Sequence, residues 1–399
     1  MSRSDAIFVS VTPRDPIIAR DSRPFGPGGR MKSLDMLYPS VTAGAYRTML
    51  GRFEGGDFSK DRVAALKELE IAGPLLFIGN ELFFPLPCDM FVWVGNDGRR
   101  RVSALIPKQL EDGEECNLPE GLWPVNVSED VKPAAVPAFC SNRIMSSWLS
   151  GVKEEFRAPP DLETNGRQDG YSVFPAKDIR SHVAIDSKTG AHLEGQLFMT
   201  SGLDFTLPSE TNPARLAIRI RVDQDNMFNG SVGDLTGFNP IGGERRIAFW
   251  RPEVSADLWR CPEETQAALR QTDTEPKILV RLILATPACF TKGWKPGWLS
   301  NGNKDKQPEG TPPGCPGVKL RLVSACVGRW QPISGWSLEE GSVGEKPIRR
   351  LVPAGSVYFF ELIDGSASEL SAAWLESVSD VEQDRNDGFG LALWGPWRK

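Results

Sequence analysis

Residues 278–285 read ILVRLILA, and two further apolar runs follow, VKLRLVSAC at 318–326 and SVYFFELI at 356–363. β-Branched and aromatic residues are frequent in these runs, and each run has the length of a buried strand. An amphipathic helix at 368–377 and a last strand at 390–394 complete the pattern. A ferredoxin-like or RRM-like unit has this order: a strand, a connection, two strands, a helix and a strand. The first helix of such a unit is not visible in this half.

The amino-terminal half begins with a strand and two helices. The strand is expected at 6–11, and a loop rich in glycine, proline and arginine follows it. Ser40 is expected as the N-cap of a helix that ends at Gly51, because its hydroxyl can accept a first-turn N–H. A second helix is expected at 59–71, where apolar residues recur at threefold spacing.

More strand patterns follow these helices. They are expected at 75–78, 82–84, 90–94, 181–185, 193–199 and 216–222. The last of them alternates apolar residues with Arg219 and Arg221, which predicts one buried face and one basic face.

These patterns predict an α+β protein with tandem ferredoxin-like (RRM-like) domains and a long insertion. At about 150 residues per domain, the length of 399 residues allows two or three domains. We expect an N-terminal RRM-like domain at 1–250 and a C-terminal one at 251–399. Periodicity is weak at 96–176, so this segment is predicted to be an insertion, with one short helix at 141–149.

The charge balance restricts the possible partners. The chain has 46 basic and 52 acidic side chains, a formal net charge of −6 and a pI near 5.3. Domains that bind nucleic acid on their own are usually basic. Any contact with nucleic acid is therefore expected to be local.

Cysteine and hydropathy patterns indicate a soluble protein. The seven cysteines include no C-x-x-C pair, so a local zinc site is disfavoured and free thiols in a reducing cytosol are expected. No segment has the apolar length of a signal-peptide core or a membrane span. We expect a cytoplasmic protein with no membrane association.

The sequence offers little for cofactor or metal chemistry. Its only histidines are His182 and His192, and a metal site there would need carboxylates such as Asp186 and Glu194. Structural or RNA-facing histidines are the favoured interpretation. The usual phosphate-cradle, dinucleotide and nucleophile-elbow motifs are also absent, so no metal and no cofactor are predicted.

Positive charge gathers in one segment near the amino terminus. Between residues 12 and 52 there are seven basic and three acidic side chains, a local balance of +4. Guanidinium groups, hydroxyls and helix N–H groups there could hold phosphates, or the arginines could pair with Asp15 and Asp21. The candidate residues are Arg20, Arg23, Lys32, Ser40, Thr42 and Arg47.

Two other segments combine glycine or tryptophan with basic residues. NPIGGERR contains Gly242, Gly243, Arg245 and Arg246, and the glycines allow close backbone approach. TKGWKPGW contains Lys292, Trp294 and Lys295, which suit phosphate contact and base stacking. Tryptophans in such a loop could equally cover a domain junction.

Acidic residues cluster near the carboxyl terminus. Residues 369–387 carry six carboxylates and one base, Arg385. Such a run predicts a solvated face, or a surface that repels nucleic acid and contacts a basic protein partner.

Several segments along the whole chain together carry a resemblance to a known family. They are RDSRPFG (20–26), YPSVTAGAYRTMLG (38–51), GPLLFIGNELFFPLPCDM (73–90), HVAIDSKTGAHLEGQLF (182–198), IGGERR (241–246), TPACFTKGWKPGW (286–298), SGWSL (334–338), RRLVPAGSVYFFEL (349–362) and DGFGLALWGPW (387–397). In this order and spacing, the chain resembles the third subunit of the type III-B (Cmr) CRISPR RNA-guided effector complex. That family is the five-prime-handle-binding branch of the RAMP superfamily.

The resemblance implies a non-catalytic ribonucleoprotein subunit of antiviral defence. Such a subunit binds the five-prime, repeat-derived handle of the guide RNA, docks on the large polymerase-palm-like subunit and adjoins backbone RAMP subunits. It implies contacts with handle phosphates for Arg20, Arg23, Ser40, Thr42 and Arg47, and a glycine-rich backbone-contact loop at 242–246. It also places a hairpin at 182–192 against the RNA, with His182, Lys188, Thr189 and His192.

Two other functions stay open. Relatives that cleave precursor guide RNA generally use a histidine near the first strand and helix, whereas residues 12–51 contain none. A metal-independent endoribonuclease would here need His182 or His192 as general base. A protein-only assembly subunit without RNA contact is the third possibility.

Overall fold

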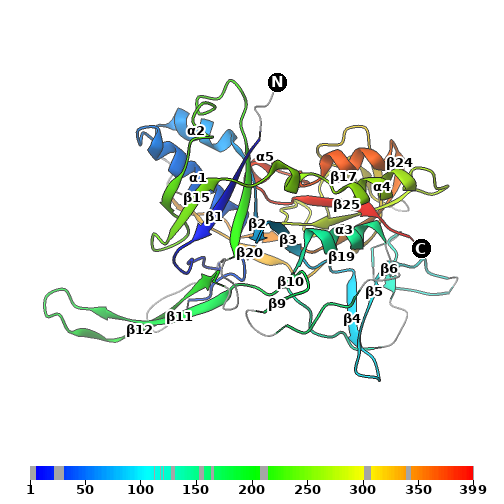
Figure 1. The fold of residues 1–399 in the computed structure, drawn as a ribbon, viewed down its shortest axis with the longest axis horizontal. Coiled ribbons are helices and arrows are strands. Elements are labelled where there is room, and N and C mark those ends of the chain that lie inside the picture. Colours follow the sequence, from blue (N-terminus) through cyan, green and yellow to red (C-terminus); the bar gives the residue numbers. More distant parts are fainter. Residues whose placement is uncertain are drawn as a thin grey trace.

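Two antiparallel β-sheets, flanked by helices, form the body of the protein (Figure 1). The structure is a computed structural model that describes residues 6–21, 31–111, 113–116, 118–119, 121–126, 131–151, 157–162, 166–206, 214–300, 307–337 and 343–398. Helices and antiparallel sheets share one chain, so the fold is α+β, as the sequence predicts.

The first sheet contains a ferredoxin-like core. Its order is β14 (Gly237–Pro240), β15 (Ile247–Pro252), β1 (Ile7–Pro13), β13 (Arg215–Arg221), β2 (Glu70–Ile78), β3 (Glu81–Pro85), β8 (Phe139–Ser141), β10 (Tyr171–Ser172) and β9 (Arg167–Gln168). Strands β15, β1, β13 and β2 are adjacent, which is the 4-1-3-2 order of a β-α-β-β-α-β unit. The residues between β13 and β14 form turns where that unit has its second helix.

The second sheet repeats this order. It runs β17 (Leu299–Ser300), β18 (Glu309–Gly310), β19 (Lys319–Cys326), β24 (Val357–Asp364), β16 (Leu279–Leu284) and β25 (Ala392–Pro396). Strands β25, β16, β24 and β19 again give 4-1-3-2. The described residues between β16 and β19 contain no helix. The helix expected at 368–377 is the shorter 3₁₀ helix η2 (Ala367–Ala373).

The helices differ in part from the expected ones. They are α1 (Pro39–Phe53), α2 (Lys60–Glu68), α3 (Asn142–Ser150), α4 (Glu263–Thr272), α5 (Glu382–Asn386) and the 3₁₀ helix η1 (Ala256–Trp259). Helix α1 begins at Pro39 with Tyr38 at the N-cap position, so the prediction that Ser40 caps it is wrong. Proline suits the first helical position because its missing N–H is not needed there. No helix in the described part of the chain has the length and apolar content of a membrane span.

Four further pairs of short strands are described, two in or directly before the insertion and two in the second half. They are β4 (Met90–Val94) with β5 (Arg100–Ala104), β6 (Ile106–Pro107) with β7 (Val125–Asn126), β20 (Gln331–Ile333) with β23 (Arg349–Leu351), and β21 (Trp336–Ser337) with β22 (Gly344–Glu345). The predicted insertion, 96–176, also supplies α3 and the sheet strands β8, β9 and β10. The domain boundaries, 1–250 and 251–399, stay a prediction.

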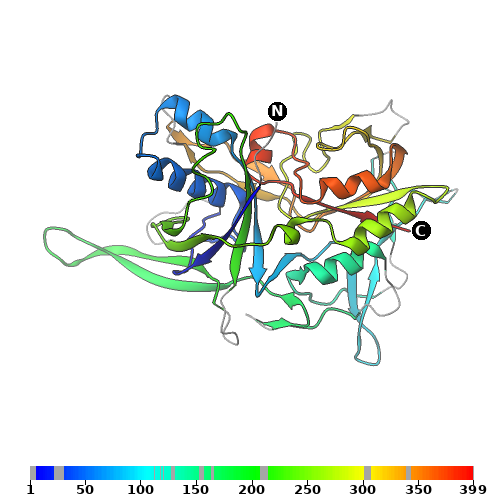
Figure 2. The same cartoon turned by 45° about the horizontal axis from the view of Figure 1, so that its top comes forward.

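A long hairpin is the most prominent projection. Strands β11 (Ala176–Ile185) and β12 (His192–Asp204) extend from the body in both views (Figures 1 and 2). The pairing starts at Ala176 with Asp204 and reaches Ile185 with His192. The hairpin therefore carries its turn well away from the sheets.

The outer face of β13 is covered rather than open. Arg219 is only 3% exposed, and it pairs with Glu70 at 3.2 Å and Glu376 at 3.0 Å. Arg221 contacts the same two carboxylates. β13 is a central strand whose outer face meets the second half of the chain, so the predicted basic face is an internal ion-pair cluster.

A second buried ion pair joins the insertion to the second sheet. Asp89 is 0% exposed and pairs with Arg281 on β16. The indole N–H of Trp148 on α3 donates to Asp89 at 2.9 Å, and Arg281 donates to the Trp148 carbonyl. One apolar cluster includes residues of both sheets, and the rings of Phe84 and Trp374 meet in it with centroids 6.4 Å apart.

Candidate RNA interface

Two of the predicted segments, the amino-terminal loop and the glycine-rich turn, meet the base of the β11–β12 hairpin at residues Ile17 and Ile18. The Ile17 amide donates to the Leu203 carbonyl at 2.9 Å, and the Leu203 amide returns a bond of 2.7 Å. The Gly243 amide donates to the Ile18 carbonyl at 2.7 Å. We call residues 14–21, 31–35, 199–203 and 241–246 the loop junction. It joins the amino-terminal loop, the base of the β11–β12 hairpin and the glycine-rich turn.

The glycine-rich turn connects β14 to β15 and needs its first glycine. Gly242 has φ +71°, and a Cβ there would lie 2.5 Å from the Ile18 carbonyl oxygen. Glu244 and Arg245 also have positive φ values, 54° and 51°. Such backbone is unusual for residues other than glycine and concentrates at functional turns. The turn therefore presents Arg245 on a tightly folded loop.

Exposed cations surround the junction. Arg20, Lys32 and Arg245 are exposed, and Arg246 pairs with Glu244 at 2.9 Å. Arg20 and Ser33 form an isolated β-bridge, which holds the two sides of the amino-terminal loop together. Arg23 lies outside the described residues. Among the predicted site residues, the structure thus brings together Arg20, Lys32, Gly242, Gly243, Arg245 and Arg246.

One residue of this region is absent from the sequence prediction. Lys177, near the start of β11, pairs with Asp35 at 3.2 Å and also donates to the Leu34 carbonyl. It thereby fastens the hairpin to the amino-terminal loop. Its partners lie more than 140 residues earlier, so no local pattern marks it.

The hairpin presents polar groups at its tip, whereas its strands also expose Ile179, Val183 and Leu197. Lys188, Thr189 and His192 are exposed at its tip. Asp186 accepts the Thr189 amide at 2.9 Å and the Lys188 amide at 2.7 Å, and these bonds hold the pKa of its carboxyl below the usual value.

His182 lies further from the tip of the hairpin. It stacks on Phe198 with ring centroids 5.2 Å apart, and its Nε2 lies 2.8 Å from the Thr200 hydroxyl. An imidazole that stacks on one side chain and is bonded to another is held in one orientation.

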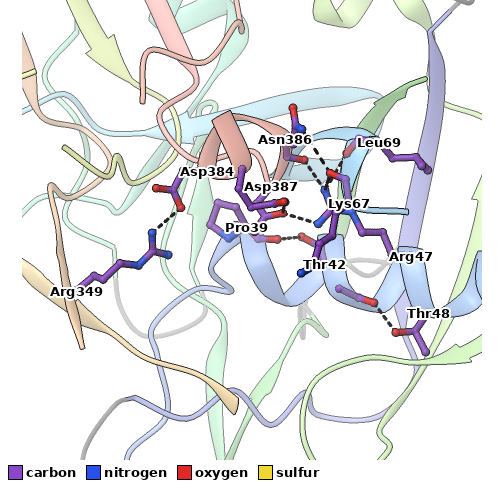
Figure 3. Close-up of polar contacts among 12 residues, drawn as sticks. Pro39, Thr42, Arg47, Thr48, Lys67, Leu69, Arg349, Asp384, Asn386 and Asp387 are labelled. Carbon is purple, nitrogen blue, oxygen red and sulfur yellow. Dashed lines mark hydrogen bonds and ion pairs between the residues drawn. The ribbon is translucent and has the colours of Figure 1, made fainter. Parts of the chain in front are cut away.

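Two residues of helix α1 that were predicted to contact RNA make their contacts inside the protein instead (Figure 3). Thr42 is 0% exposed and donates its hydroxyl to the Pro39 carbonyl at 3.0 Å. Arg47 pairs with Asp387 and donates to the Leu69 carbonyl at 2.8 Å and the Asn386 carbonyl at 3.0 Å. Thr42 therefore offers no surface to a phosphate, and Arg47 is occupied in joining α1 to β2 and α5. Ser40, in the first turn, is half-buried.

The lysine and tryptophan loop is a separate site in the second half. Asp380 accepts the amides of Thr291 at 2.7 Å and Gly297 at 2.8 Å, which pins the loop. Lys292 donates to the Leu299 carbonyl at 3.2 Å, and Trp294 is 36% exposed. Burial, together with the charge of Lys292, lowers the pKa of Lys295. The interactions described for this loop lie within the second half, not at the loop junction.

Four of the six carboxylates in the acidic run at 369–387 are engaged in contacts within the fold, whereas Glu369 and Glu382 are exposed. Asp384 is 2% exposed and pairs with Arg349 at 2.6 Å (Figure 3). Asp380 holds the loop at 291–297, and Glu376 and Asp387 hold arginines of the first half. The sequence predicted either a solvated face or a surface for a basic protein partner, and neither prediction holds for these four carboxylates.

A cavity lies between the two halves beside the amino-terminal loop. Its volume is about 250 Å³, and its lining includes Asp21, Tyr38, Phe83, Thr286 and Gln331. The Tyr38 hydroxyl donates to the Pro332 carbonyl at 3.3 Å across it, and burial raises the pKa of Tyr38 to about 12. Among the residues described, no group of three or more histidine, cysteine and carboxylate side chains is placed to hold a metal ion.

The fold defines the chain as an α+β protein with two ferredoxin-like cores. Residues 9–397 match the family model described as CRISPR-associated protein (Cas_Cmr3). The chain therefore belongs to the Cas_Cmr3 family and is a Cmr-type CRISPR subunit, as the sequence resemblance implies. Comparison with curated proteins gave no match.

Solved structures show more distant similarity. A chain of the type III-B Cmr-beta complex bound to cognate target RNA and AMPPnP is 15% identical, with a TM-score of 0.45, over 88% of this chain and 86% of that chain. A chain of the Csm3–Csm4 subcomplex of the type III-A CRISPR-Cas interference complex is 10% identical, with a TM-score of 0.39, over 98% and 100%. At these values the assignment depends on the family match alone.

Proposed function

We propose that this chain binds the five-prime, repeat-derived handle of the guide RNA at the loop junction, without cutting it. We also propose that it docks on the large palm-domain subunit of the effector complex, beside backbone RAMP subunits. The observation that carries the proposal is the meeting of the basic amino-terminal loop, the hairpin base and the glycine-rich turn at Ile17 and Ile18. These segments are far apart in the sequence, and their exposed side chains include Arg20, Lys32 and Arg245.

The chemistry of the junction suits an RNA backbone. Guanidinium groups bind phosphates through paired hydrogen bonds, and glycine lets a backbone approach closely. The net charge of the whole chain is −6, so a local cationic surface is the place where an anionic ligand is favoured. Much of the carboxyl-terminal acid is used inside the fold, which reduces its repulsion of RNA.

The salt dependence of RNA binding tests this proposal. We expect Arg20→Ala and Arg245→Ala each to lower the affinity for repeat-derived RNA. For single-stranded RNA, each lost phosphate contact reduces the slope of log K against log salt by about 0.7. Arg52→Ala, at the exposed end of α1, is the matched control and should bind like the parent. Equal affinity of all four proteins would contradict the assignment of the loop junction.

The same preparations test whether the chain cleaves RNA. His182 is fixed by Phe198 and Thr200 on a hairpin that projects from the body, an arrangement that supports RNA contact. We expect repeat RNA to stay intact. Defined cleavage that disappears in the His182→Ala, His192→Ala double variant would instead identify an endoribonuclease.

Purification of the assembled complex tests the partners. A tagged chain is expected to recover a large palm-domain subunit together with RNA of uniform five-prime end. Recovery of the protein partners, but no crosslinks between RNA and the loop junction, would indicate an assembly subunit without RNA contact.

A further inference from the structure

We infer that the open face of the β14–β15 hairpin, at Phe238, stacks a base of single-stranded RNA. This inference rests on the proposed function and extends the RNA surface from the glycine-rich turn onto the strands that carry it. Phe238 is 63% exposed although it lies within a strand of the first sheet. Its ring centroid is 5.0 Å from that of Phe249, the residue opposite it on β15.

The two faces of this hairpin differ in their surroundings. Trp250 and Ala248 on β15 are fully buried, and the Trp250 ring lies 6.1 Å from that of Tyr46 on α1. Phe238 and Phe249 alternate with these residues, so they lie on the face away from α1. This arrangement leaves a pair of aromatic rings on the side of the sheet that the helix does not cover.

The sheet face that carries Phe238 is exposed to solvent only at one end. On the neighbouring strand β1, Phe8 has the same orientation and is covered by Trp259, with centroids 5.9 Å apart. Ser10 is 1% exposed. Thr12, opposite Phe249, is half-buried, and the face opens from there toward the loop junction. The second half of the chain thus covers this face at Phe8 and leaves it open at Phe238.

Cations and hydroxyls border the exposed rings. The Arg14 guanidinium carbon lies 5.7 Å from the centroid of Phe238. Thr236, directly before β14, and Arg251 on β15 are exposed, and Arg251 also pairs with Glu253. The same hairpin carries Arg245 in its turn. An aromatic face for a base, next to guanidinium groups for phosphates, is the composition of single-stranded nucleic-acid sites.

The chemistry favours RNA over a protein partner on this face. A stable protein interface buries about 800 Å² on each side around an apolar centre. Here two rings are bordered by arginine and threonine rather than by more apolar residues. Because β14 ends the sheet order, addition of a partner strand to its free edge is the competing occupant, and the experiment includes it.

The experiment measures the affinity of the full chain for a single-stranded RNA of repeat sequence, with and without an abasic substitution at each position. Phe238→Ala is expected to weaken binding about tenfold, since one base–aromatic stack is lost. Phe238→Trp should retain the affinity. The slope of log K against log salt should stay at the parent value, because no phosphate contact is removed. Phe53→Ala is the control, since Phe53 is 58% exposed at the end of α1.

The outcomes separate this inference from the proposed function. At one abasic position, the parent and Phe238→Ala should bind equally, which would locate the stacked base. If Arg245→Ala weakens binding and Phe238→Ala does not, the stacking inference is wrong and the proposed function stands. If the parent itself does not bind this RNA, the proposed function fails. Loss of a protein subunit from complexes of Phe238→Ala, with unchanged RNA affinity, would overturn the inference in favour of strand addition.

Discussion

Arg47 lies in a basic segment of the kind that binds phosphate, but its side chain makes its contacts inside the fold. It belongs to the basic segment of the sequence, yet its guanidinium group holds Asp387 and three backbone carbonyls. Asp387 lies 340 residues away. No local pattern could distinguish Arg47 from the exposed Arg20, because the partner that turns it inward is distant in the sequence.

Replacing Arg47 should therefore affect stability before it affects RNA. Arg47→Met leaves Asp387 and the ends of β2 and α5 without their common donor. We expect a loss of about 2 to 3 kcal/mol in the free energy of unfolding. Urea denaturation measures this, and Arg52→Met is the matched control because Arg52 is exposed. Wild-type stability together with a reduced salt slope of RNA binding would instead make Arg47 a phosphate contact.

The elements were predictable where the residue pattern is local. Apolar runs of strand length placed β4 at its observed bounds and β16, β19 and β24 within a residue or two at each end. The faces of β13 were not predictable, because Glu70 and Glu376 come from distant segments. Likewise β14 and β15, short strands on either side of a tight turn, gave no periodic signal long enough to identify.

Shortening the β11–β12 hairpin should weaken RNA binding without impairing the fold. Ser181 and Met199 are paired, so an Asn-Gly turn can replace residues 182–198 and close a shorter hairpin. The bonds of Leu203 to Ile17, nearer the body, are retained.

The shortened protein should unfold at nearly the same temperature as the parent but bind repeat RNA more weakly. Calorimetry and RNA titration measure the two effects. A large fall in the midpoint of thermal unfolding would show that the hairpin supports the fold, and unchanged RNA affinity would remove it from the proposed interface.

At the scale of the whole molecule, the sequence order predicted two ferredoxin-like patterns, and both sheets have the 4-1-3-2 order. The contribution of the insertion could not be predicted. Its strands β8, β9 and β10 extend the first sheet, and its helix α3 packs beside α4 and β25. Such packing depends on surfaces that are complementary only after both halves have folded.

The pair of Asp89 and Arg281 tests how far the halves depend on each other. Asp89→Asn leaves Arg281 buried without its counter-charge, so we expect a loss of about 3 kcal/mol in the free energy of unfolding. Because one apolar cluster includes both sheets, this loss should appear as a shift of a single unfolding transition. Asp97→Asn, in an exposed pair with Arg101, should resemble the parent. Two separate transitions would show that the halves unfold independently.

The central claim is that three segments, distant in the sequence, form one binding surface for the guide-RNA handle. The most direct measurement is photo-crosslinking of the assembled complex, with 4-thiouridine placed in the handle and the crosslinked peptides identified by mass spectrometry. We expect crosslinks at the loop junction, in residues 14–20, 199–203 and 242–246, and along the projecting hairpin at 188–192. Crosslinks confined to other segments of this chain, such as 99–101 or 291–298, or no crosslinks to the chain at all, would contradict the account.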